Sequence, residues 1–388
     1  MKFDFDTLIE RRGTDCVKWD TAKEEDVLPM WVADMDFKAA PCIADALRKR
    51  IEHGVFGYTI VPDNYYKAIT GWFERRHNWH IDRSWILYTT GVVPAISATI
   101  KALTKPGDKV IIQTPVYNCF FSSIRNDECI IAENPLTYEN NSYHIDFEGF
   151  EKLAADERTK VFLLCNPHNP AGRVWTADEL TKLNDICMKH GVKVISDEIH
   201  CELIMKGHTY IPFASLSDEC LHNSITLNSP TKAFNIAGLQ IANVVACDED
   251  VRHKIDRAIN INEICDVNPF GVLALQAAYN EGAEWLDSLN EYLYDNYLEL
   301  RRFFSERMPN IGVTHLEGTY LVWADIRSTG MTSDALTEKL LKEGHVMVNS
   351  GTMYGKTAGE GFLRINIACP RSRMIEGLER MARVIGKL

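Results

Sequence analysis

The chain has 388 residues, of which 46% are hydrophobic and 25% are charged, and its formal net charge is -12. This composition is that of an ordinary globular protein, long enough for two domains and a large buried core. The negative charge argues against a general nucleic-acid binder, which needs a basic surface. No apolar run approaches the length needed to span a membrane.

Cysteine usage and the first residues indicate a compartment. The eleven cysteines are scattered without a CxxC pair and the histidines lack metal-ligand spacing, so neither a metal site nor a redox motif is indicated. Such usage fits a reducing cytoplasm, where a free cysteine packs as a small hydrophobic residue. The opening stretch MKFDFDTLIERRG is charged from its second residue and is not a signal peptide. We therefore expect a cytoplasmic protein.

The first forty or so residues lack a sheet pattern of their own, whereas the chain from about residue 84 to 246 alternates short apolar runs with helical patterns. The apolar runs are nearly continuous, as expected of strands buried on both faces of a sheet. They cover residues 84–90, 109–114, 128–133, 160–165, 192–197, 224–228 and 241–246. Alternation of this kind predicts an α/β fold with a mainly parallel central sheet.

Two helices can be predicted together with their ends. One opens on a Thr-x-x-Glu capping box at Thr176 and closes on Gly191. The other follows residue 281, where apolar residues recur with a period of 3.6 until Pro309. We expect this long helix to lead into a smaller C-terminal unit of mixed strands and helices. The predicted division is a large domain of residues 47–284 and a small domain of residues 1–46 and 285–388, with the N-terminal segment wrapped onto it.

Polar residues follow five of the predicted strands. Because ligands of open α/β sheets bind beyond the carboxyl ends of the strands, these residues are expected to meet at one edge. They are a glycine turn into a helix at Gly91, then Tyr117, Asn166, Asp197, and finally Ser229, Thr231 and Lys232. Each has an ordinary structural explanation, as a turn, a cap, a core residue or a surface lysine. Their convergence in this order makes accident the poorer explanation.

The combined set fits an aromatic aldehyde phosphate, pyridoxal 5′-phosphate (PLP). A lysine amine forms a Schiff base with the aldehyde, most readily when desolvation lowers its pKa. A carboxylate can pair with the pyridine nitrogen and keep it protonated. A tyrosine ring can stack on the pyridine face, while hydroxyls and the free N–H groups of a helix N-terminus hold the phosphate.

These residues lie in motifs that resemble those of the fold-type I PLP enzymes, the aspartate-aminotransferase-like class, over essentially the whole chain. Within that class the chain resembles the cystathionine β-lyase/C–S lyase branch. The branch-specific motifs are PMWVADMDF and SDEIH, and the shared motifs include TTGVVPAISA, NPHNPAGRVW, SPTKAFNIAGLQ and FLRINIACPRS. The resemblance implies PLP as the cofactor and a homodimer with shared active sites.

The resemblance also implies roles for the cofactor-binding residues. Lys232 carries the Schiff base and is catalytic together with Tyr117, which stacks on the ring. Asp197 meets the pyridine nitrogen, and Asn166 meets the 3′-oxygen. The phosphate is implied to contact Gly91, Val92, Val93, Ser229, Thr231 and, across the dimer interface, Tyr58. On the substrate side, the resemblance implies that the Arg364 guanidinium binds the substrate carboxylate through two hydrogen bonds. It also implies that Val32 and Ala33 line the pocket.

Three positions depart from the expected patterns. Gln240 stands eight residues after Lys232, where many aminotransferases have an arginine that braces the phosphate. His200 stands where the wider class has the tyrosine of a D-x-x-Y pattern, and it is either a cofactor contact or a packed histidine. Asn118 follows Tyr117 where some C–S lyases place a second tyrosine, which leaves the role of that neighbour open.

The resulting prediction is a PLP-dependent cysteine-S-conjugate β-lyase. It eliminates a thiol from L-cystathionine or a related S-substituted cysteine and yields pyruvate and ammonia. The nearest alternative is a class I/II aminotransferase, because the site residues of the two overlap. A non-enzymatic cofactor-binding or regulatory protein is disfavoured by the retained Lys232. The expected partners are a small amino-acid substrate and a second copy of the chain, with neither nucleic acid nor membrane.

Overall fold

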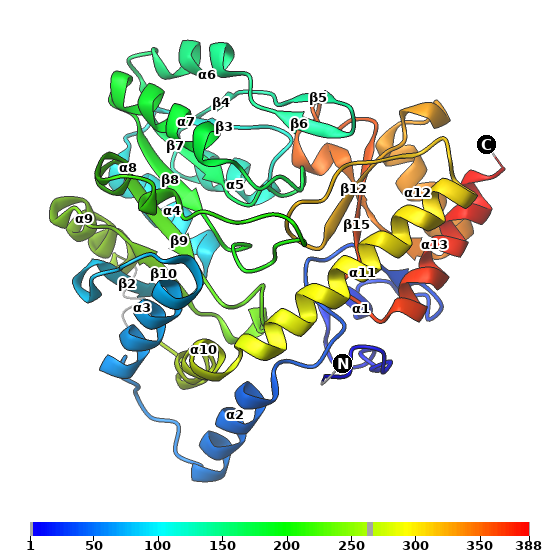
Figure 1. Ribbon diagram of the computed structural model, residues 1–388, viewed down its shortest axis with the longest axis horizontal. Helices are drawn as coiled ribbons and strands as arrows, with labels where there is room; N and C mark the ends of the chain where they lie inside the picture. The colour runs from blue at the N-terminus through cyan, green and yellow to red at the C-terminus, as the bar shows by residue number, and fades with distance from the viewer. Residues whose placement is uncertain (1–2, 262–266, 388) are drawn as a thin grey trace.

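The computed structural model describes residues 3–261 and 267–387 (Figure 1). Its centre is a seven-stranded sheet of order β2-β10-β9-β8-β7-β3-β4. The strands are β2 (Ile86–Thr89), β3 (Lys109–Ile112), β4 (Ile130–Glu133), β7 (Thr159–Cys165), β8 (Lys193–Asp197), β9 (Ser224–Asn228) and β10 (Ala242–Val245). Each predicted apolar run contributes one strand. Within this sheet β10 runs antiparallel to both of its neighbours, and the other six strands share one direction. The prediction of a mainly parallel sheet is therefore confirmed.

Helices cover both faces of this sheet. Consecutive residues of a strand point to opposite faces. Accordingly, Val110 and Ile112 of β3 pack in one core, with α4 (Val92–Leu103), α5 (Asn118–Asn126) and α9 (Glu249–Asn260). Ile111 packs in the other core, with α6 (Phe147–Ala154), α7 (Ala177–His190) and α8 (Asp218–Asn223). Burial on both faces is the reason why the strands read as nearly continuous apolar runs.

Both predicted helices are present, with ends close to those predicted. At the start of α7, Thr176 Oγ1 accepts from the Glu179 N–H and the Glu179 carboxylate accepts from the Thr176 N–H, while Gly191 caps the other end with a φ of 69°. The long helix is α11 (Ala283–Arg307), which crosses the molecule from the neighbourhood of α10 (Pro269–Glu281) towards the C-terminal unit (Figure 1). α10 itself packs against α2 (Pro41–His53) and α3 (Asp63–His77).

The C-terminal unit contains a four-stranded antiparallel sheet of order β11-β12-β15-β14. Its elements are β11 (Gly312–Val313), β12 (Leu321–Asp325), α12 (Ser333–Gly344), β14 (Asn349–Ser350), β15 (Phe362–Asn366) and α13 (Arg371–Ile385). The N-terminal segment joins it, since β1 (Leu28–Pro29) pairs in parallel with β13 (Val346–Met347). A short helix, α1 (Val17–Asp20), precedes β1. A hairpin of β5 (Thr137–Glu139) and β6 (Ser142–His144) lies between β4 and α6 in the chain.

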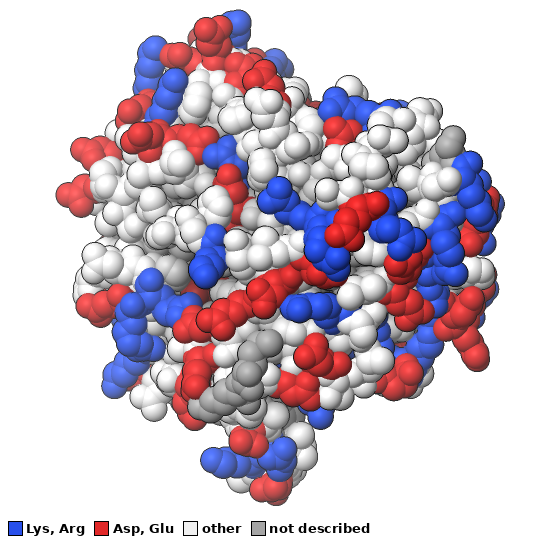
Figure 2. Space-filling model, turned by 45° about the vertical axis from the view of Figure 1, so that its right-hand side comes forward, with Lys and Arg blue, Asp and Glu red and all other residues white. Residues whose placement is uncertain are grey.

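The surface carries charges of both signs, and a diagonal row of acidic side chains crosses the face shown in Figure 2. On α11, Asp287, Glu291 and Asp295 recur every four residues and are exposed. Among residues 3–261 and 267–387, no helix combines the length and the apolar character that crossing a membrane requires.

Candidate active site

A small pocket, with a cavity volume of about 40 Å³, lies beyond the carboxyl ends of β7 and β8. Both strands end there, at Cys165 and Asp197. The lining residues are Ala33, Val92, Val93, Tyr117, Cys165, Asn169, Asp197, Ile199, His200 and Lys232. The structure thus brings together six of the predicted site residues, which are Ala33, Val92, Val93, Tyr117, Asp197 and Lys232. The site forms at the predicted sheet edge.

Lys232 lies four residues beyond the end of β9 and points its amine into this pocket. Its Nζ donates a hydrogen bond to the Ala33 carbonyl at 2.6 Å. Burial and then the positive charge of Arg364 lower the pKa of Lys232 to about 8, against the opposing effect of Asp34 and Asp197. A lysine with such a pKa has an appreciable neutral fraction near neutral pH, and the neutral amine is the nucleophile.

Asp197, the last residue of β8, is buried and lines the same pocket. Its Oδ1 accepts a hydrogen bond from the Ile199 N–H at 3.1 Å. Burial raises the pKa of Asp197 to about 7, the Ile199 N–H lowers it, and repulsion by Glu198 raises it further. The pocket therefore contains a carboxyl group whose charge is poorly compensated by the protein itself.

Tyr117 and the start of α4 form the other walls. Tyr117 is the N-cap residue of α5, and burial followed by the neighbouring Cys119 raises the pKa of its hydroxyl well above the usual value. Gly91 is the N-cap of α4, and Val92 and Val93 in the first turn line the pocket. The first N–H groups of a helix lack intrahelical partners and carry the positive end of its dipole, which suits a phosphate.

Two predicted phosphate contacts, Ser229 and Thr231, are buried next to Lys232 but are not among the lining residues. Their hydroxyl oxygens lie 2.8 Å apart, and Ser229 Oγ donates to the Ile241 carbonyl at 2.6 Å. The third, Tyr58, is 97% exposed. Their contacts with a phosphate therefore stay predictions.

The structure assigns the pocket-lining asparagine to position 169 rather than 166. Asn166 is fully buried, and its Nδ2 donates to the Ile211 carbonyl at 3.2 Å. Asn169, three residues later in the same turn, lines the pocket and accepts a hydrogen bond from Arg364. The motif NPHNPAG presents two Asn-Pro pairs, and the prediction named the asparagine of the first pair, Asn166, which is not among the lining residues.

Arg364 on β15 is 3% exposed and is aimed at the same region from the C-terminal unit. Its Nη1 donates to Asn169 Oδ1 at 3.2 Å and its Nη2 to the Trp31 carbonyl at 2.8 Å, while Nε has no partner in the described part of the chain. The guanidinium carbon lies 4.7 Å from the centre of the Tyr354 ring. A buried guanidinium with a free donor is suited to a carboxylate.

Of the two residues predicted to line the substrate pocket, one does so. Ala33 lines the pocket, whereas Val32 does not and instead accepts a hydrogen bond through its carbonyl from Asn366. His200 is a pocket residue, and its Nδ1 has no partner within the described residues. Burial, Lys232 and Arg364 hold the pKa of His200 well below its usual value, so its ring is neutral. Asn118 is exposed and is not among the lining residues.

A second group of titratable side chains is not among the lining residues of this pocket. His77, Cys201 and Glu202 have ligand atoms within 4.8 Å of one another. Glu202 Oε1 already accepts from Trp72 Nε1 at 2.6 Å and lies 2.7 Å from His77 Nε2. These hydrogen bonds account for the cluster without an ion.

The donors around the pocket fit PLP. The uncompensated carboxyl of Asp197 matches a protonated ring nitrogen, the amine of Lys232 matches an aldehyde, and the N-terminus of α4 matches a phosphate. A mainly parallel sheet covered on both faces, with this set at the carboxyl ends of its strands, defines an enzyme of fold type I.

Comparison with known proteins narrows this class. The chain belongs to the aminotransferase class I and II family, whose model matches residues 25–381. Cystathionine beta-lyase PatB of Bacillus subtilis is 42% identical over 381 residues, covering 97% of this chain and 98% of PatB. Protein MalY of Escherichia coli is 34% identical, with 99% of each chain covered. These relatives place the chain in the cystathionine β-lyase/C–S lyase branch, as the motifs predicted.

The fold also agrees closely with that of a solved structure. Cystalysin from Treponema denticola, which contains a pyridoxal 5′-phosphate cofactor, has a TM-score of 0.96 and 37% identity, with 100% of both chains covered.

Proposed function

We propose that this chain is a PLP-dependent C–S lyase of the cystathionine β-lyase type, which removes a thiol from L-cystathionine or a related S-substituted cysteine. One observation carries the proposal. Lys232, with a lowered pKa, and Asp197, with a raised pKa, line one pocket, and Arg364 donates a hydrogen bond to Asn169 in the wall of that pocket. The amine, the carboxyl and the guanidinium match the aldehyde, the ring nitrogen and the substrate carboxylate.

Side chains and one helix N-terminus from several parts of the chain would hold the cofactor. Lys232 would bind it covalently, Asp197 would accept from the ring nitrogen, and Tyr117 would cover one ring face. Asn169, rather than Asn166, is the amide in position to reach the ring oxygen, because it lines the pocket. The first turn of α4 at Gly91, Val92 and Val93 would bind the phosphate, together with Ser229, Thr231 and the partner subunit's Tyr58.

When bound, PLP supplies an aldehyde that joins the substrate amine and a protonated ring that accepts electrons from Cα. Asp197 keeps the proton on the ring nitrogen, because a carboxylate beside a cation is stabilised in its charged form. Arg364 orients the substrate through its carboxylate. Lys232, as a free amine, would remove the Cα proton, and the Ala33 carbonyl, 2.6 Å from its Nζ, lies where it can orient that amine.

The thiolate then leaves from Cβ, which completes the elimination step. The proton that Lys232 took from Cα can be returned to the departing sulfur, and Tyr117, whose hydroxyl stays protonated, is the second candidate donor. Water then hydrolyses the released three-carbon product. For L-cystathionine and one water, the products are homocysteine, pyruvate and ammonia.

The deciding experiment measures pyruvate and free thiol from L-cystathionine, with PLP present and no 2-oxo acid added. Equal amounts of pyruvate and thiol are expected, and Lys232→Ala is the blank. If pyruvate is absent and amino transfer appears when a 2-oxo acid is supplied, the chain is an aminotransferase, the reaction that the family's name describes.

We also propose a homodimer in which each subunit completes the other's site. The loop between α2 and α3 exposes Val55, Phe56, Tyr58 and Ile60, an apolar surface that a second copy could bury. Mixing Tyr58→Ala with Lys232→Ala tests this. A mixed dimer carries one site with both residues intact, so activity above that of either variant alone is expected, and no recovery after subunit exchange would contradict the shared site.

The remaining assignments are a division into domains and a location. We propose the boundaries 47–284 for the large domain and 1–46 with 285–388 for the small one, supported by the pairing of β1 with β13. A cytoplasmic location is supported by the ten cysteines in the described residues, all of which are free.

A further inference from the structure

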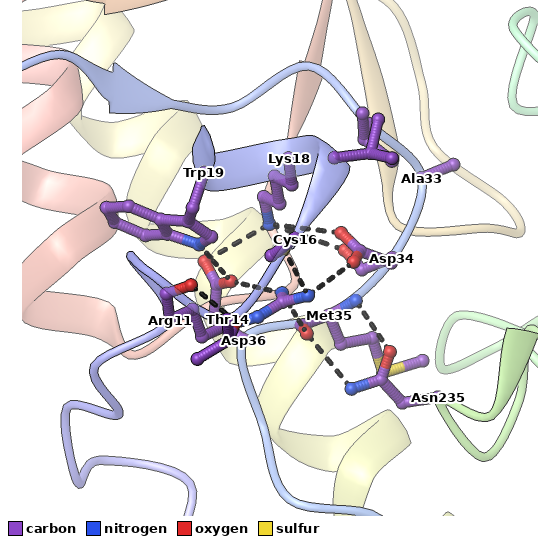
Figure 3. A network of polar contacts seen from close by, with 12 residues as sticks. Arg11, Thr14, Cys16, Lys18, Trp19, Ala33, Asp34, Met35, Asp36 and Asn235 are labelled. Atoms are coloured by element: carbon purple, nitrogen blue, oxygen red, sulfur yellow. Dashed lines mark hydrogen bonds and ion pairs between the residues drawn. The ribbon is translucent and has the colours of Figure 1, made fainter. Parts of the chain in front are cut away.

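A buried cluster of charged residues near the N-terminus has no part in the proposed mechanism. It consists of Arg11, Lys18, Trp19, Asp34 and Asp36, which we call the N-terminal clasp (Figure 3). Asp36 is at its centre. Lys18 Nζ lies 3.1 Å from its Oδ2, and Arg11 Nη1 and Trp19 Nε1 donate to its Oδ1 at 2.7 and 2.9 Å. Lys18 and Asp36 are each 1% exposed.

The clasp compensates its charges well. Burial raises the pKa of Asp36, but Lys18, Trp19 and Arg11 together outweigh burial and hold this pKa below its usual value. Arg11 Nη2 also donates to Asp34 Oδ2 at 2.7 Å. Buried ion pairs contribute little net stability, because desolvation offsets their attraction. The clasp is therefore better explained by the geometry that it fixes.

What the clasp fixes is the backbone of residues 31–36. Arg11 Nη1 donates to the Met35 carbonyl at 2.9 Å, and Lys18 Nζ lies 3.4 Å from the Asp34 carbonyl oxygen. Trp31 Nε1 donates to the Lys18 carbonyl at 3.1 Å. The segment cannot shift away from the clasp without breaking charged hydrogen bonds.

Two asparagines hold the same segment from elsewhere in the chain. Asn235 exchanges hydrogen bonds with Met35, donating to its carbonyl and accepting from its N–H, both at 2.9 Å (Figure 3). Asn366 Nδ2 donates to the carbonyls of Val32 and Asp34 at 2.5 and 2.7 Å. Residues 31–36 are thereby fixed from several directions.

The carbonyls of this segment meet the two principal groups of the site. The Ala33 carbonyl accepts from Lys232 Nζ at 2.6 Å and from the Tyr320 hydroxyl at 2.9 Å. The Trp31 carbonyl accepts from Arg364 Nη2 at 2.8 Å and from Asn349 Nδ2 at 3.0 Å. A single stretch of backbone thus contacts both the lysine amine and the arginine that faces the substrate.

We propose that the N-terminal clasp is a positioning device, which holds the Ala33 carbonyl where it orients the Lys232 amine for proton transfer at Cα. The inference deepens the proposed function and rests on it for the role of Lys232 as base. The residues of the clasp act through the backbone and do not touch the substrate.

Lys18→Met tests the proposal most sharply, because methionine keeps the apolar stem and removes the charge. We expect kcat for β-elimination to fall about tenfold, since small displacements of a catalytic group are costly. KM should change by less than about threefold, because Asn169 and Tyr354 still hold Arg364. The isotope effect on kcat with substrate deuterated at Cα should rise, since proton transfer becomes slower. An unchanged kcat and isotope effect in the folded variant would contradict the proposal.

Two further variants complete the design. Lys18→Arg retains the charge and should restore kcat to within about threefold of the wild type, whereas a loss equal to that of Lys18→Met would exclude the charge as the cause. Lys109→Met is the matched control. It removes a half-buried lysine paired with Asp156 at 2.5 Å at the start of β3, away from the pocket, and should leave kcat and the isotope effect unchanged.

A measurement on the cofactor-free protein separates this inference from the proposed function. On addition of PLP, the rate at which Lys232 bonds to it, followed by visible absorbance, should fall about tenfold in Lys18→Met. Hydrogen exchange at the Met35 and Asp36 amides should accelerate, while that of β8 should not. Unchanged rates in both measurements would overturn the clasp's role even if the wild type proved to be no lyase. If Lys18→Met does not fold, Arg11→Gln, at a half-buried position, should show the same changes to a smaller extent.

Discussion

Asp36 and Asp197 are both buried carboxyl groups, yet the protein treats them in opposite ways. Asp36 receives a lysine, an arginine and a tryptophan N–H, and its pKa is lowered. Asp197 receives one backbone N–H from Ile199, and its pKa is raised to about 7. Burial is similar at the two positions, so the difference lies in what the surroundings provide.

This difference distinguishes a structural carboxylate from a ligand-binding one. A buried charge that the fold has already compensated stabilises one arrangement of the chain. A buried carboxyl that the protein compensates poorly, beside a pocket, is suited to bind a cation, and a perturbed pKa of this kind is common at functional sites. A protonated pyridine nitrogen would supply that cation.

The largest expected effect is the loss of activity in Lys232→Ala. Without the amine there is neither a covalent attachment point nor a base for the Cα proton, so release of pyruvate from L-cystathionine should fall by more than about a thousandfold. Activity retained within about tenfold of the wild type would remove Lys232 from the mechanism.

Asp197→Asn should have the next largest effect. An amide cannot carry the charge that keeps the ring nitrogen protonated, so kcat is expected to fall by about a hundredfold or more. Affinity for PLP, measured by equilibrium dialysis, should also decrease. Comparison with Asp36→Asn decides whether the loss is specific to the pocket carboxyl.

Asp36→Asn should act mainly on stability. Removing the charge of Asp36 leaves Lys18 and Arg11 with Asp34 as their remaining carboxylate partner in the clasp, at a cost of about 3 kcal/mol in the free energy of unfolding. Urea unfolding of the wild type and the variant measures this. A smaller loss of stability than in Asp197→Asn would reverse the contrast between the two carboxyl groups.

The smallest effect is a pH dependence with opposite signs at the two aspartates. In the cofactor-free protein, Asp197 keeps its proton up to about pH 7, whereas the unfolded chain loses it near its ordinary value of 3.8. The folded state therefore binds more protons in this window, and the contribution of Asp197 to stability falls as pH rises. For Asp36 the contribution is present above pH 3.8 and is lost as pH falls through its lowered pKa.

Urea unfolding of the cofactor-free wild type and Asp197→Asn at several pH values between about 4 and 8 checks this. The stability of the wild type relative to the variant should decrease as pH rises, and Glu198, present in both, largely cancels. A difference independent of pH would mean that Asp197 is compensated after all.

Much of the fold could be predicted because local patterns determine it. Burial on both faces makes the strands of the large sheet apolar throughout, and Thr176 with Gly191 marks the ends of α7. The antiparallel direction of β10 could not be predicted, since a buried antiparallel strand has the same apolar character as a parallel one.

Part of the site could likewise be predicted from the sequence, and part could not. Lys232, Asp197 and Tyr117 follow strand ends, so the topology of the sheet alone brings them together. The choice between Asn166 and Asn169 depends on how one turn is oriented, which the sequence does not encode locally. The contact between the Ala33 carbonyl and Lys232 joins residues 199 positions apart and depends on the packing of the N-terminal segment against both units.

The most direct test of this account is the titration of the Asp197 carboxyl by carbon-13 NMR, with Asp197→Asn used for assignment. In the cofactor-free protein we expect a pKa of about 7 for this carboxyl group. Loading with PLP should lower it to below about 4, because the protonated ring nitrogen then places a positive charge beside it. A pKa already in the ordinary range without the cofactor, or one that does not move on loading, would contradict the account.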